Sequence, residues 1–319
     1  VERWGRVPGT GADTAHRRAA RGLSNGFVGR WATRHAMNPE PVALVIGTRG
    51  SPLAVWQAEH VAARLGEASP GVSVHLERIR TTGDKILNVP LAQIGGKALF
   101  VKEIEQALID GKAHFAVHSI KDVPGELAPG LVLACIPKRE DPRDVFVSRY
   151  GHDLSQIEHA ARVGTSSARR RIMLAKARPD LRFEPLRGNV DTRLRKVQEG
   201  VVDATVLAWA GLRRLQLHDR ATQVLPPELS LPAVGQGALG IECRSDDAST
   251  MALLSTLHDS ETATAVAAER GVMIAAEGSC QVPIAAYACR DEEGKIWLRA
   301  MLATPDASRV RWMEIREPW

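Results

Sequence analysis

The stretch that decides the fold is Val42-Ala-Leu-Val-Ile-Gly-Thr-Arg-Gly-Ser-Pro52. Its first five residues form an apolar run that is typical of a short β-strand. Ser51 suits the N-cap of a helix and Pro52 suits the first helical position, so a helix is expected from Pro52 to about residue 65. The same plan returns at Arg162-Val-Gly-Thr-Ser-Ser167, where a strand ends and a helix over 168–177 is expected.

Further strands and helices alternate around these two segments. Alternation of this kind predicts an α/β fold with mostly parallel sheets, in which two lobes direct the carboxyl ends of their strands toward a shared cleft. A helix over 262–277, followed by a loop of small residues and two strands, indicates a small third domain. The expected strands are 72–79, 115–117, 131–136, 181–186, 204–208, 284–289 and 296–302, and the other expected helices are 99–109, from Asn189 or Asp191 to about 199, and 210–215.

The composition narrows the classes of protein. With 44% hydrophobic and 25% charged residues the chain is globular, and no stretch approaches the ~18 consecutive apolar residues of a transmembrane helix. Residues 1–40 hold seven arginines and three acidic residues, so they carry +4 of the net charge of +5, and the rest of the chain gives little indication of a nucleic-acid surface. We exclude residues 1–40 from the fold as a disordered or mis-started extension, with Met37 as the alternative start; an arginine-rich organellar leader is the other interpretation.

Several patterns argue against metal and nucleotide sites. His114 and His118 fall on an expected strand and not on one face of a helix. Gly235-Gln-Gly-Ala-Leu-Gly240 matches a dinucleotide-binding motif, but a strand-like segment follows it where that motif needs a helix. The cysteines form no Cys-x-x-Cys pair, which predicts neither a metal site nor a disulfide framework and favours the cytoplasm. They are Cys135, Cys243, Cys280 and Cys289.

The Gly-Thr turns and the arginines indicate an anionic ligand. Each turn offers backbone N–H groups and a serine hydroxyl at a helix N-terminus, which favours anions, although helix capping alone explains a single turn equally well. Arginines recur near the ends of strands, and a guanidinium group binds a carboxylate through two parallel hydrogen bonds. A cleft with many arginines predicts a ligand with several carboxylates or phosphates. The arginines are Arg49, Arg169, Arg170, Arg171, Arg187, Arg193, Arg213 and Arg214.

Two single residues could carry chemistry. Asp122 lies beside Lys121 in His118-Ser-Ile-Lys-Asp-Val-Pro124. It either closes a turn as an ion pair, or it stabilises positive charge on a substrate or moves a proton. Cys280 lies in Gly278-Ser-Cys-Gln-Val-Pro283. Its thiol is either buried and inert or, in a loop of small residues, an accessible nucleophile or attachment point.

Taken together, these motifs resemble the porphobilinogen deaminase family, also called hydroxymethylbilane synthase. The matching stretches keep the family's order and cover roughly residues 42–303. They are Gly47-Thr-Arg-Gly-Ser-Pro-Leu-Ala-Val-Trp-Gln57, Thr82-Gly-Asp84, Gly95-Gly-Lys-Ala-Leu-Phe-Val-Lys-Glu103, His118-Ser-Ile-Lys-Asp-Val-Pro124, Gly164-Thr-Ser-Ser-Ala-Arg-Arg170, Leu186-Arg-Gly-Asn-Val190, 231–244 and 278–283.

The resemblance implies a fold and an activity. Two lobes like those of periplasmic binding proteins would be joined to a small α+β third domain. Domain 1 would span 41–137 and 236–256, domain 2 would span 138–235, and domain 3 would span 257–319 and be shorter at its C-terminus than in similar proteins. The enzyme, a transferase of tetrapyrrole biosynthesis, would join four porphobilinogen units head to tail with loss of ammonia to give hydroxymethylbilane. Its primer would be a dipyrromethane cofactor linked to Cys280, and it would work as a cytoplasmic monomer.

The same match implies the site residues. Asp122 would be the catalytic carboxylate, because loss of ammonia leaves a cationic azafulvene that a negative charge stabilises. No metal, nucleic acid or membrane partner is implied. The alternative is an inactive two-lobed protein that binds a polyanion, which would need the arginines but neither Asp122 nor Cys280. The cofactor would be held by Cys280, Lys121, Ser119, Asp84, Thr165, Ser167, Arg169, Arg170, Arg187 and Gly188, and the substrate by Arg49, Ser51, Lys97, Phe100, Arg193, Arg214 and Gln236.

Overall fold

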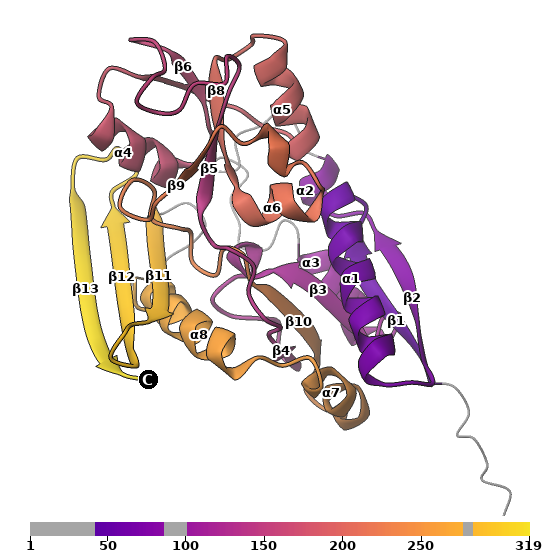
Figure 1. Cartoon of the computed structure of the whole chain (residues 1–319). Coiled ribbons are helices and arrows are strands. Elements are labelled where there is room, and N and C mark those ends of the chain that lie inside the picture. Colours follow the sequence, from indigo (N-terminus) through magenta and orange to yellow (C-terminus); the bar gives the residue numbers. More distant parts are fainter. Residues whose placement is uncertain (1–41, 86–100, 277–282) are drawn as a thin grey trace, which may run out of the picture. The chain divides into compact units, whose positions relative to one another are not determined.

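The structure is a computed structural model that describes residues 42–85, 101–276 and 283–319, without the side chains of residues 84 and 85. Its first lobe is built on a five-stranded sheet with the order β2-β1-β3-β10-β4 (Figure 1). The strands are β1 (Val42–Arg49), β2 (Val72–Ile79), β3 (Phe115–Ser119), β4 (Leu131–Cys135) and β10 (Leu239–Arg244). The helices of this lobe are α1 (Pro52–Ala68), α2 (Thr82–Lys85), α3 (Lys102–Ile109) and α7 (Ala248–Ser255), and a 3-10 turn, η1 (Ile120–Asp122), follows β3.

The core of the first lobe lies between this sheet and its helices. Ala58, Val61 and Leu65 recur at helical spacing along α1 and are buried against the sheet. They meet Leu44 and Ile46, which alternate along β1 and are both buried. The strand and the helix that the sequence 42–52 predicts, β1 and α1, therefore pack directly on each other. This packing fixes the turn between them at the carboxyl end of β1.

The second lobe repeats the arrangement of the first. Its sheet has the order β7-β6-β8-β5-β9, and Phe146, Val163 and Val206 form its core with Leu174. The strand expected at 204–208 and the helix expected at 168–177 are both confirmed with the same first and last residues. The elements are β5 (Asp144–Ser148), β6 (Arg162–Gly164), α4 (Ala168–Ala177), β7 (Arg182–Glu184), α5 (Val190–Gln198), β8 (Ala204–Ala208), α6 (Trp209–Arg214), η2 (His218–Arg220) and β9 (Gln223–Leu225).

Both five-stranded sheets are mixed. β10 runs antiparallel to β3 and β4, β5 runs antiparallel to β8 and β9, and the other pairs are parallel. Four of the five strands in each sheet thus point the same way, as the expectation of mostly parallel sheets requires. The reversed strand in each sheet is the one that the chain enters from the other lobe, through 136–143 into β5 and through 226–238 into β10. These two segments are called the crossings below.

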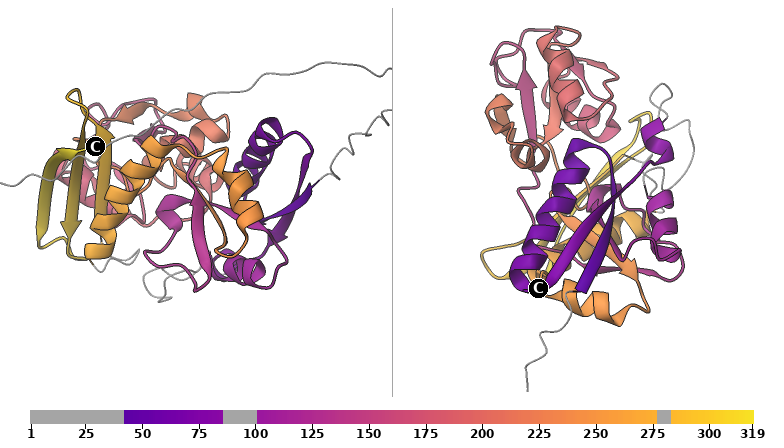
Figure 2. Two further views of the ribbon diagram at one scale, coloured as in Figure 1. Left: turned by 90° about the horizontal axis from the view of Figure 1, so that it is seen from below. Right: turned by 90° about the vertical axis from the view of Figure 1, so that its right-hand side faces the viewer.

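A third, antiparallel sheet follows the two lobes. It consists of β11 (Ile284–Arg290), β12 (Lys295–Ala303) and β13 (Val310–Pro318), and α8 (Ser260–Ala275) lies against it (Figure 2). Ala265 of α8 packs on Ala286 and Ala300 on one face of this sheet. The other face packs against α4 of the second lobe through Met173 and Met301.

Candidate active site

The two Gly-Thr turns begin helices in the way that capping predicts. The hydroxyl of Ser51 accepts a hydrogen bond from the Ala54 N–H at 3.4 Å, and the hydroxyl of Ser167 accepts one from the Arg170 N–H at 3.4 Å. The N–H of Ser167 in turn donates to the hydroxyl of Thr165 at 3.1 Å. The serine hydroxyls therefore serve the first turns of α1 and α4, and each turn lies at the carboxyl end of a strand, β1 and β6.

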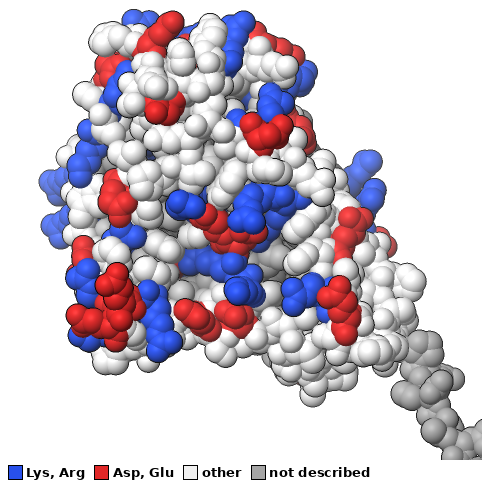
Figure 3. All heavy atoms as spheres, viewed as in Figure 1, with Lys and Arg blue, Asp and Glu red and all other residues white. Residues whose placement is uncertain are grey.

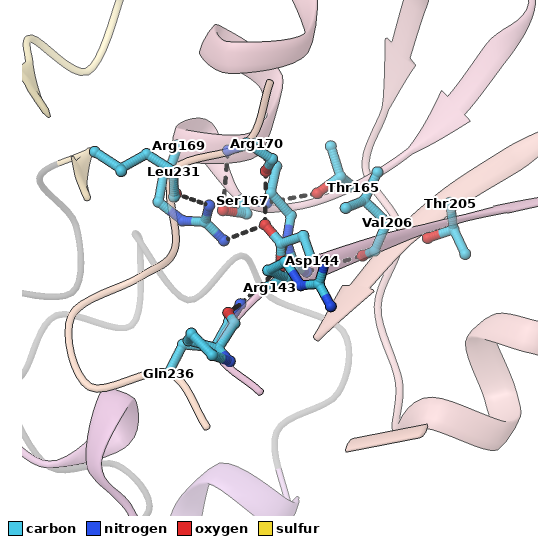
Figure 4. Close-up of polar contacts among 12 residues, drawn as sticks. Arg143, Asp144, Thr165, Ser167, Arg169, Arg170, Thr205, Val206, Leu231 and Gln236 are labelled. Carbon is cyan, nitrogen blue, oxygen red and sulfur yellow. Dashed lines mark hydrogen bonds and ion pairs between the residues drawn. The ribbon is translucent and has the colours of Figure 1, made fainter. Parts of the chain in front are cut away.

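A buried aspartate, Asp144, lies at the centre of the polar network at the start of β5 (Figure 4). Its two carboxylate oxygens accept hydrogen bonds from Arg169 Nη2 at 2.9 Å and Arg170 Nη2 at 2.7 Å. Ser230 Oγ and Gln236 Nε2 donate to the same carboxylate at 2.7 and 2.9 Å. Burial acts to raise the pKa of Asp144, but the two guanidinium groups outweigh it and hold this pKa well below the usual range of an aspartate.

Arg169 and Arg170, for which the family resemblance implies a role in holding the cofactor, are both more than nine-tenths buried. Besides Asp144, Arg169 donates to the carbonyl oxygen of Leu231, and Arg170 Nη1 donates to that of Val206 at 2.8 Å. Their guanidinium groups are thus held in fixed orientations at the first turn of α4. Of the five N–H donors on each group, some remain for a ligand.

Lys121 and Asp122 lie in η1, directly after β3. Asp122 is exposed, and Lys121 is partly buried. Burial lowers the pKa of Lys121 to about 8; Asp122 and Asp144 oppose this shift, and Arg170 and Arg169 reinforce it. The end of β3 in the first lobe therefore lies within electrostatic range of the Asp144 network of the second.

Arg193 brings a further cation to the same place. Burial lowers the pKa of Arg193 to about 10; Arg170 and Arg187 lower it further and Asp122 raises it. Its Nε donates to the carbonyl oxygen of Gly188 at 2.8 Å. Gly188 has φ +118, and a Cβ there would lie 2.6 Å from a methyl group of Thr192, so only glycine fits this turn.

Arg214 lies in a second part of the site, where α6 approaches the beginning of α1. Its guanidinium is buried, lies 5.9 Å from the ring centroid of Trp56, and donates to the carbonyl oxygen of Gly237 at 2.7 Å. Burial lowers the pKa of Arg214 to about 10. Together with Gly50, Trp56 and Arg78, it lines an open pocket of about 390 Å³ at the carboxyl ends of β1 and β2.

Two other predicted residues are held by protein partners. The hydroxyl of Ser119 accepts a hydrogen bond from Gln57 Nε2 at 2.9 Å. Gln236 is 1% exposed, and its amide nitrogen donates to Asp144 and to the carbonyl oxygen of Pro142. The segment around Gln236 continues into β10 and not into a helix, so it lacks the structural context of a dinucleotide motif.

Lysine and arginine side chains gather around a hollow in the middle of the face that Figure 3 shows, with acidic side chains among them.

Cys280, Lys97 and Phe100 lie outside the described residues, as does the side chain of Asp84. Each of the three described cysteines has a pKa raised by burial. It is raised to about 12 for Cys135 and about 11 for Cys243, and it is raised as well for Cys289. Within the described part of the chain, no three His, Cys, Asp or Glu side chains come together as metal ligands, and no helix is long and apolar enough to cross a membrane.

Sequence reasoning missed Asp144 and Glu269. Asp144 directly precedes the apolar run Val-Phe-Val, in a segment whose charged residues around Pro142 indicate a link between the lobes. An acidic residue at the first position of a buried strand is the one sequence feature that could have indicated a functional Asp144. Glu269 lies in the alanine-rich helix α8 and is fully buried, which is exceptional for a glutamate and shows only in three dimensions.

Comparisons with known proteins agree along the chain. The family model described as porphobilinogen deaminase, dipyrromethane cofactor binding domain, matches residues 44–252, and that of the porphobilinogen deaminase C-terminal domain matches residues 263–318. A porphobilinogen deaminase of Sorangium cellulosum is 58% identical over 88% of this chain and 93% of its own length. One of Syntrophotalea carbinolica is 56% identical over 79% of this chain and 80% of its own length.

Among solved structures, the L-cystine solute receptor of Neisseria gonorrhoeae is 17% identical over 72% of this chain and 92% of that chain. The TM-score of this pair is 0.40. Two family models together span nearly all of the described residues, and two relatives are more than half identical to this chain over the parts that align. The chain belongs to the porphobilinogen deaminase family.

Proposed function

We propose that this chain acts as a porphobilinogen deaminase, a transferase that joins four porphobilinogen units head to tail with loss of ammonia to give hydroxymethylbilane. The observation that carries the proposal is the proximity of Asp122, in η1 after β3, to Lys121 and to the partly buried Arg193 of the second lobe. An exposed carboxylate beside several cations suits a substrate that carries carboxylates and develops positive charge as ammonia leaves.

The donors of the cleft fit a dipyrromethane cofactor. Such a group carries two carboxylates on each of its two rings, so it needs several cations around it. Burial lowers the pKa values of Lys121 and Arg193, and neighbouring arginines lower them further, so a bound polyanion would relieve this crowding of positive charge. When bound, the cofactor supplies a covalently held pyrrole to which the first substrate unit is joined.

The side chains divide into two groups with different roles. The cofactor is held by Lys121, Ser119, Asp84, Thr165, Ser167, Arg169, Arg170, Arg187 and Gly188. The substrate and the growing chain are bound by Arg49, Ser51, Lys97, Phe100, Arg193, Arg214 and Gln236. Arg193 orients a substrate carboxylate by its planar fork of donors. Asp122 accepts the hydrogen bond of a pyrrole N–H and stabilises the positive charge that develops on that ring.

The covalent attachment point is assigned to Cys280. The thiolate is the reactive form of cysteine, and a raised pKa suppresses it. Burial raises the pKa values of the described thiols Cys135, Cys243 and Cys289, so none of the three is a suitable nucleophile.

We extend the proposal to a three-domain monomer that works in the cytoplasm, in keeping with thiols that form no disulfide among the described residues. Light scattering of the purified chain measures its oligomeric state.

Intact-protein mass spectrometry tests the assignment. The purified chain is expected to carry an added mass of two linked pyrrole units, and the Cys280→Ser variant is expected to lack it. Cys289→Ser is the matched control, because it removes the most accessible of the described thiols and should keep the added mass. Release of ammonia from porphobilinogen is followed in parallel. An adduct that survives Cys280→Ser, or a wild-type chain that takes up no mass and releases no ammonia when given porphobilinogen, would refute the proposal.

A further inference from the structure

Glu269, in the middle of α8, is fully buried and accepts four hydrogen bonds. Arg139 Nη1 and Nη2 donate to its two oxygens at 2.6 and 3.0 Å. The N–H groups of Gly235 and Ala288 donate at 2.6 and 2.9 Å. One carboxylate therefore binds the first crossing at Arg139, the second crossing at Gly235, and the third sheet at Ala288.

Arg139 ties the two crossings to each other as well. Its Nε donates to the carbonyl oxygen of Gln236 at 2.9 Å, and its backbone N–H donates to Thr262 at the start of α8 at 3.0 Å. Its guanidinium also lies 5.5 Å from the ring centroid of Tyr287 on β11. All three nitrogens of this largely buried guanidinium are thus engaged: Nη1 and Nη2 by Glu269, and Nε by the backbone of Gln236, which it holds in place.

The side chain of Gln236 carries this constraint into the cleft. Its amide nitrogen donates to Asp144 at 2.9 Å and to the carbonyl oxygen of Pro142 at 2.7 Å (Figure 4). Asp144 is the carboxylate that holds Arg169 and Arg170. An unbroken chain of hydrogen bonds therefore runs from Glu269 through Arg139, Gln236 and Asp144 to the two arginines.

We propose that Glu269 is a positioning residue for the arginines of the cleft: by clamping both crossings to the third sheet, it sets where Gln236 and Asp144 hold Arg169 and Arg170. The proposal rests on the function proposed above for its kinetic consequence, but the contact chain itself does not. Without the clamp, both crossings lose their shared anchor. The guanidinium groups then spread over several orientations, and the cofactor carboxylates that they hold lose their fixed places. The capture of porphobilinogen next to the cofactor weakens as a result, more than the chemical step.

The test compares Glu269→Gln with the wild-type chain, both as purified. Two quantities are measured: the kcat and KM for porphobilinogen, and the hydrogen–deuterium exchange of peptides covering 165–175 and 231–238. We expect exchange to accelerate in both peptides, and kcat/KM to fall roughly 10- to 100-fold, since small misplacements of binding groups act on this scale. Most of the fall should lie in KM, which a merely structural role at a temperature well below unfolding would leave unchanged.

Arg139→Lys keeps the positive charge beside Glu269 and is the second variant, in case Glu269→Gln does not fold. A single ammonium nitrogen cannot occupy the three positions from which Nε, Nη1 and Nη2 of Arg139 reach Gln236 and Glu269, so the same rise in KM and exchange is expected. Glu293→Gln is the matched control. It breaks the exposed pair of Glu293 with Lys295 at the turn between β11 and β12 of the third sheet, touches neither crossing, and should change neither quantity.

The outcomes separate the two proposals. Unchanged exchange in 165–175 and 231–238 for folded Glu269→Gln and Arg139→Lys overturns the positioning role, as does a KM equal to that of the wild type. A wild-type chain without turnover would overturn the proposed function, while the exchange comparison would still decide whether Glu269 positions the arginines.

Discussion

Asp144 and Arg170 are joined at two points, with Nη2 of Arg170 2.7 Å and Nε 3.2 Å from the same oxygen, Oδ1, of Asp144. The aspartate begins β5 and the arginine lies in the first turn of α4. Both side chains are more than nine-tenths buried. A buried pair of this kind is stable only as a unit, because either charge alone would be left without solvent.

Asp144→Asn should lower the free energy of unfolding by about 3–5 kcal/mol, because it leaves two buried guanidinium groups without a counter-charge. Urea unfolding at neutral pH measures the difference. Glu199→Gln, which breaks an exposed pair with Arg195 one helical turn away, is the control and should change the free energy little. Equal effects of the two substitutions would show that Asp144 is not the counter-charge of the cleft.

The difference in the free energy of unfolding between the wild type and Asp144→Asn should depend on pH in one direction. The folded pKa of Asp144 lies below that of an unfolded aspartate, about 4, so its contribution to stability is present above pH ~4. It is lost as the pH falls through the folded pKa. The gap between wild type and Asp144→Asn should therefore be constant near neutral pH and shrink below pH ~4, as unfolding curves at a series of pH values would reveal.

Gly237→Ala should destabilise the fold where the two crossings touch. Gly237 has φ +89, and a Cβ there would lie 2.3 Å from the carbonyl oxygen of Glu140. Gly71→Ala isolates the effect of backbone strain, because Gly71 has φ +98 but no atom within 4 Å of an added Cβ. We expect about 1–2 kcal/mol from strain at either site and a larger loss at Gly237, from denaturant unfolding. Equal losses would mean that the crossings shift apart without difficulty.

Periodic segments of the sequence predicted their elements well. The strand at 72–79 and the helix at 168–177 have the expected bounds, because alternation or helical spacing of apolar residues is a local property. β5 and β13 were not expected. β5 follows a charged, proline-bearing link, and its pairing with β8 and β9 joins residues far apart in the chain. Local pattern carries no information on which lobe receives such a strand.

The candidate site was predictable in its residue types and less so in its contacts. Strand ends carrying arginine and serine indicated an anion site, and the structure places Asp122 within electrostatic range of both Lys121 and Arg193. The contacts of Arg169 and Arg170 with Asp144 span 25 and 26 residues and two elements, so no motif reveals them. The role of these two arginines as cofactor ligands stays a prediction.

Asp122→Ala should nearly abolish turnover while leaving the assembly or binding of the cofactor partly intact. Removing one charged group that stabilises a developing charge raises the barrier by about 2.7–4 kcal/mol, or roughly 10²–10³ in kcat. Steady-state release of ammonia measures turnover, and intact mass measures the cofactor. Glu126→Gln, an exposed acid a few residues further along the chain, is the control. Near-normal turnover in Asp122→Ala would remove this carboxylate from the reaction.

Lys121 should impose an alkaline limit on the uptake of the cofactor. Burial lowers its pKa to about 8, so the chain without the cofactor loses this cation as the pH rises through that value. The rate at which that chain gains the mass of two pyrrole units from porphobilinogen should therefore fall above this pH. Lys121→Arg keeps its charge in this range, so its fall should begin at a higher pH.

Stability changes in the opposite direction over the same range. The folded pKa of Lys121 lies below the unfolded value of about 10.4, so the unfolded chain binds more protons between pH ~8 and ~10.4. The contribution of Lys121 to the stability of the cofactor-free chain, taken as the difference between the wild type and Lys121→Arg, should therefore rise with pH while cofactor uptake falls. A fall in uptake that occurs at the same pH in Lys121→Arg would assign the loss to another group. Because the two quantities respond with opposite sign, general alkaline unfolding cannot imitate the effect.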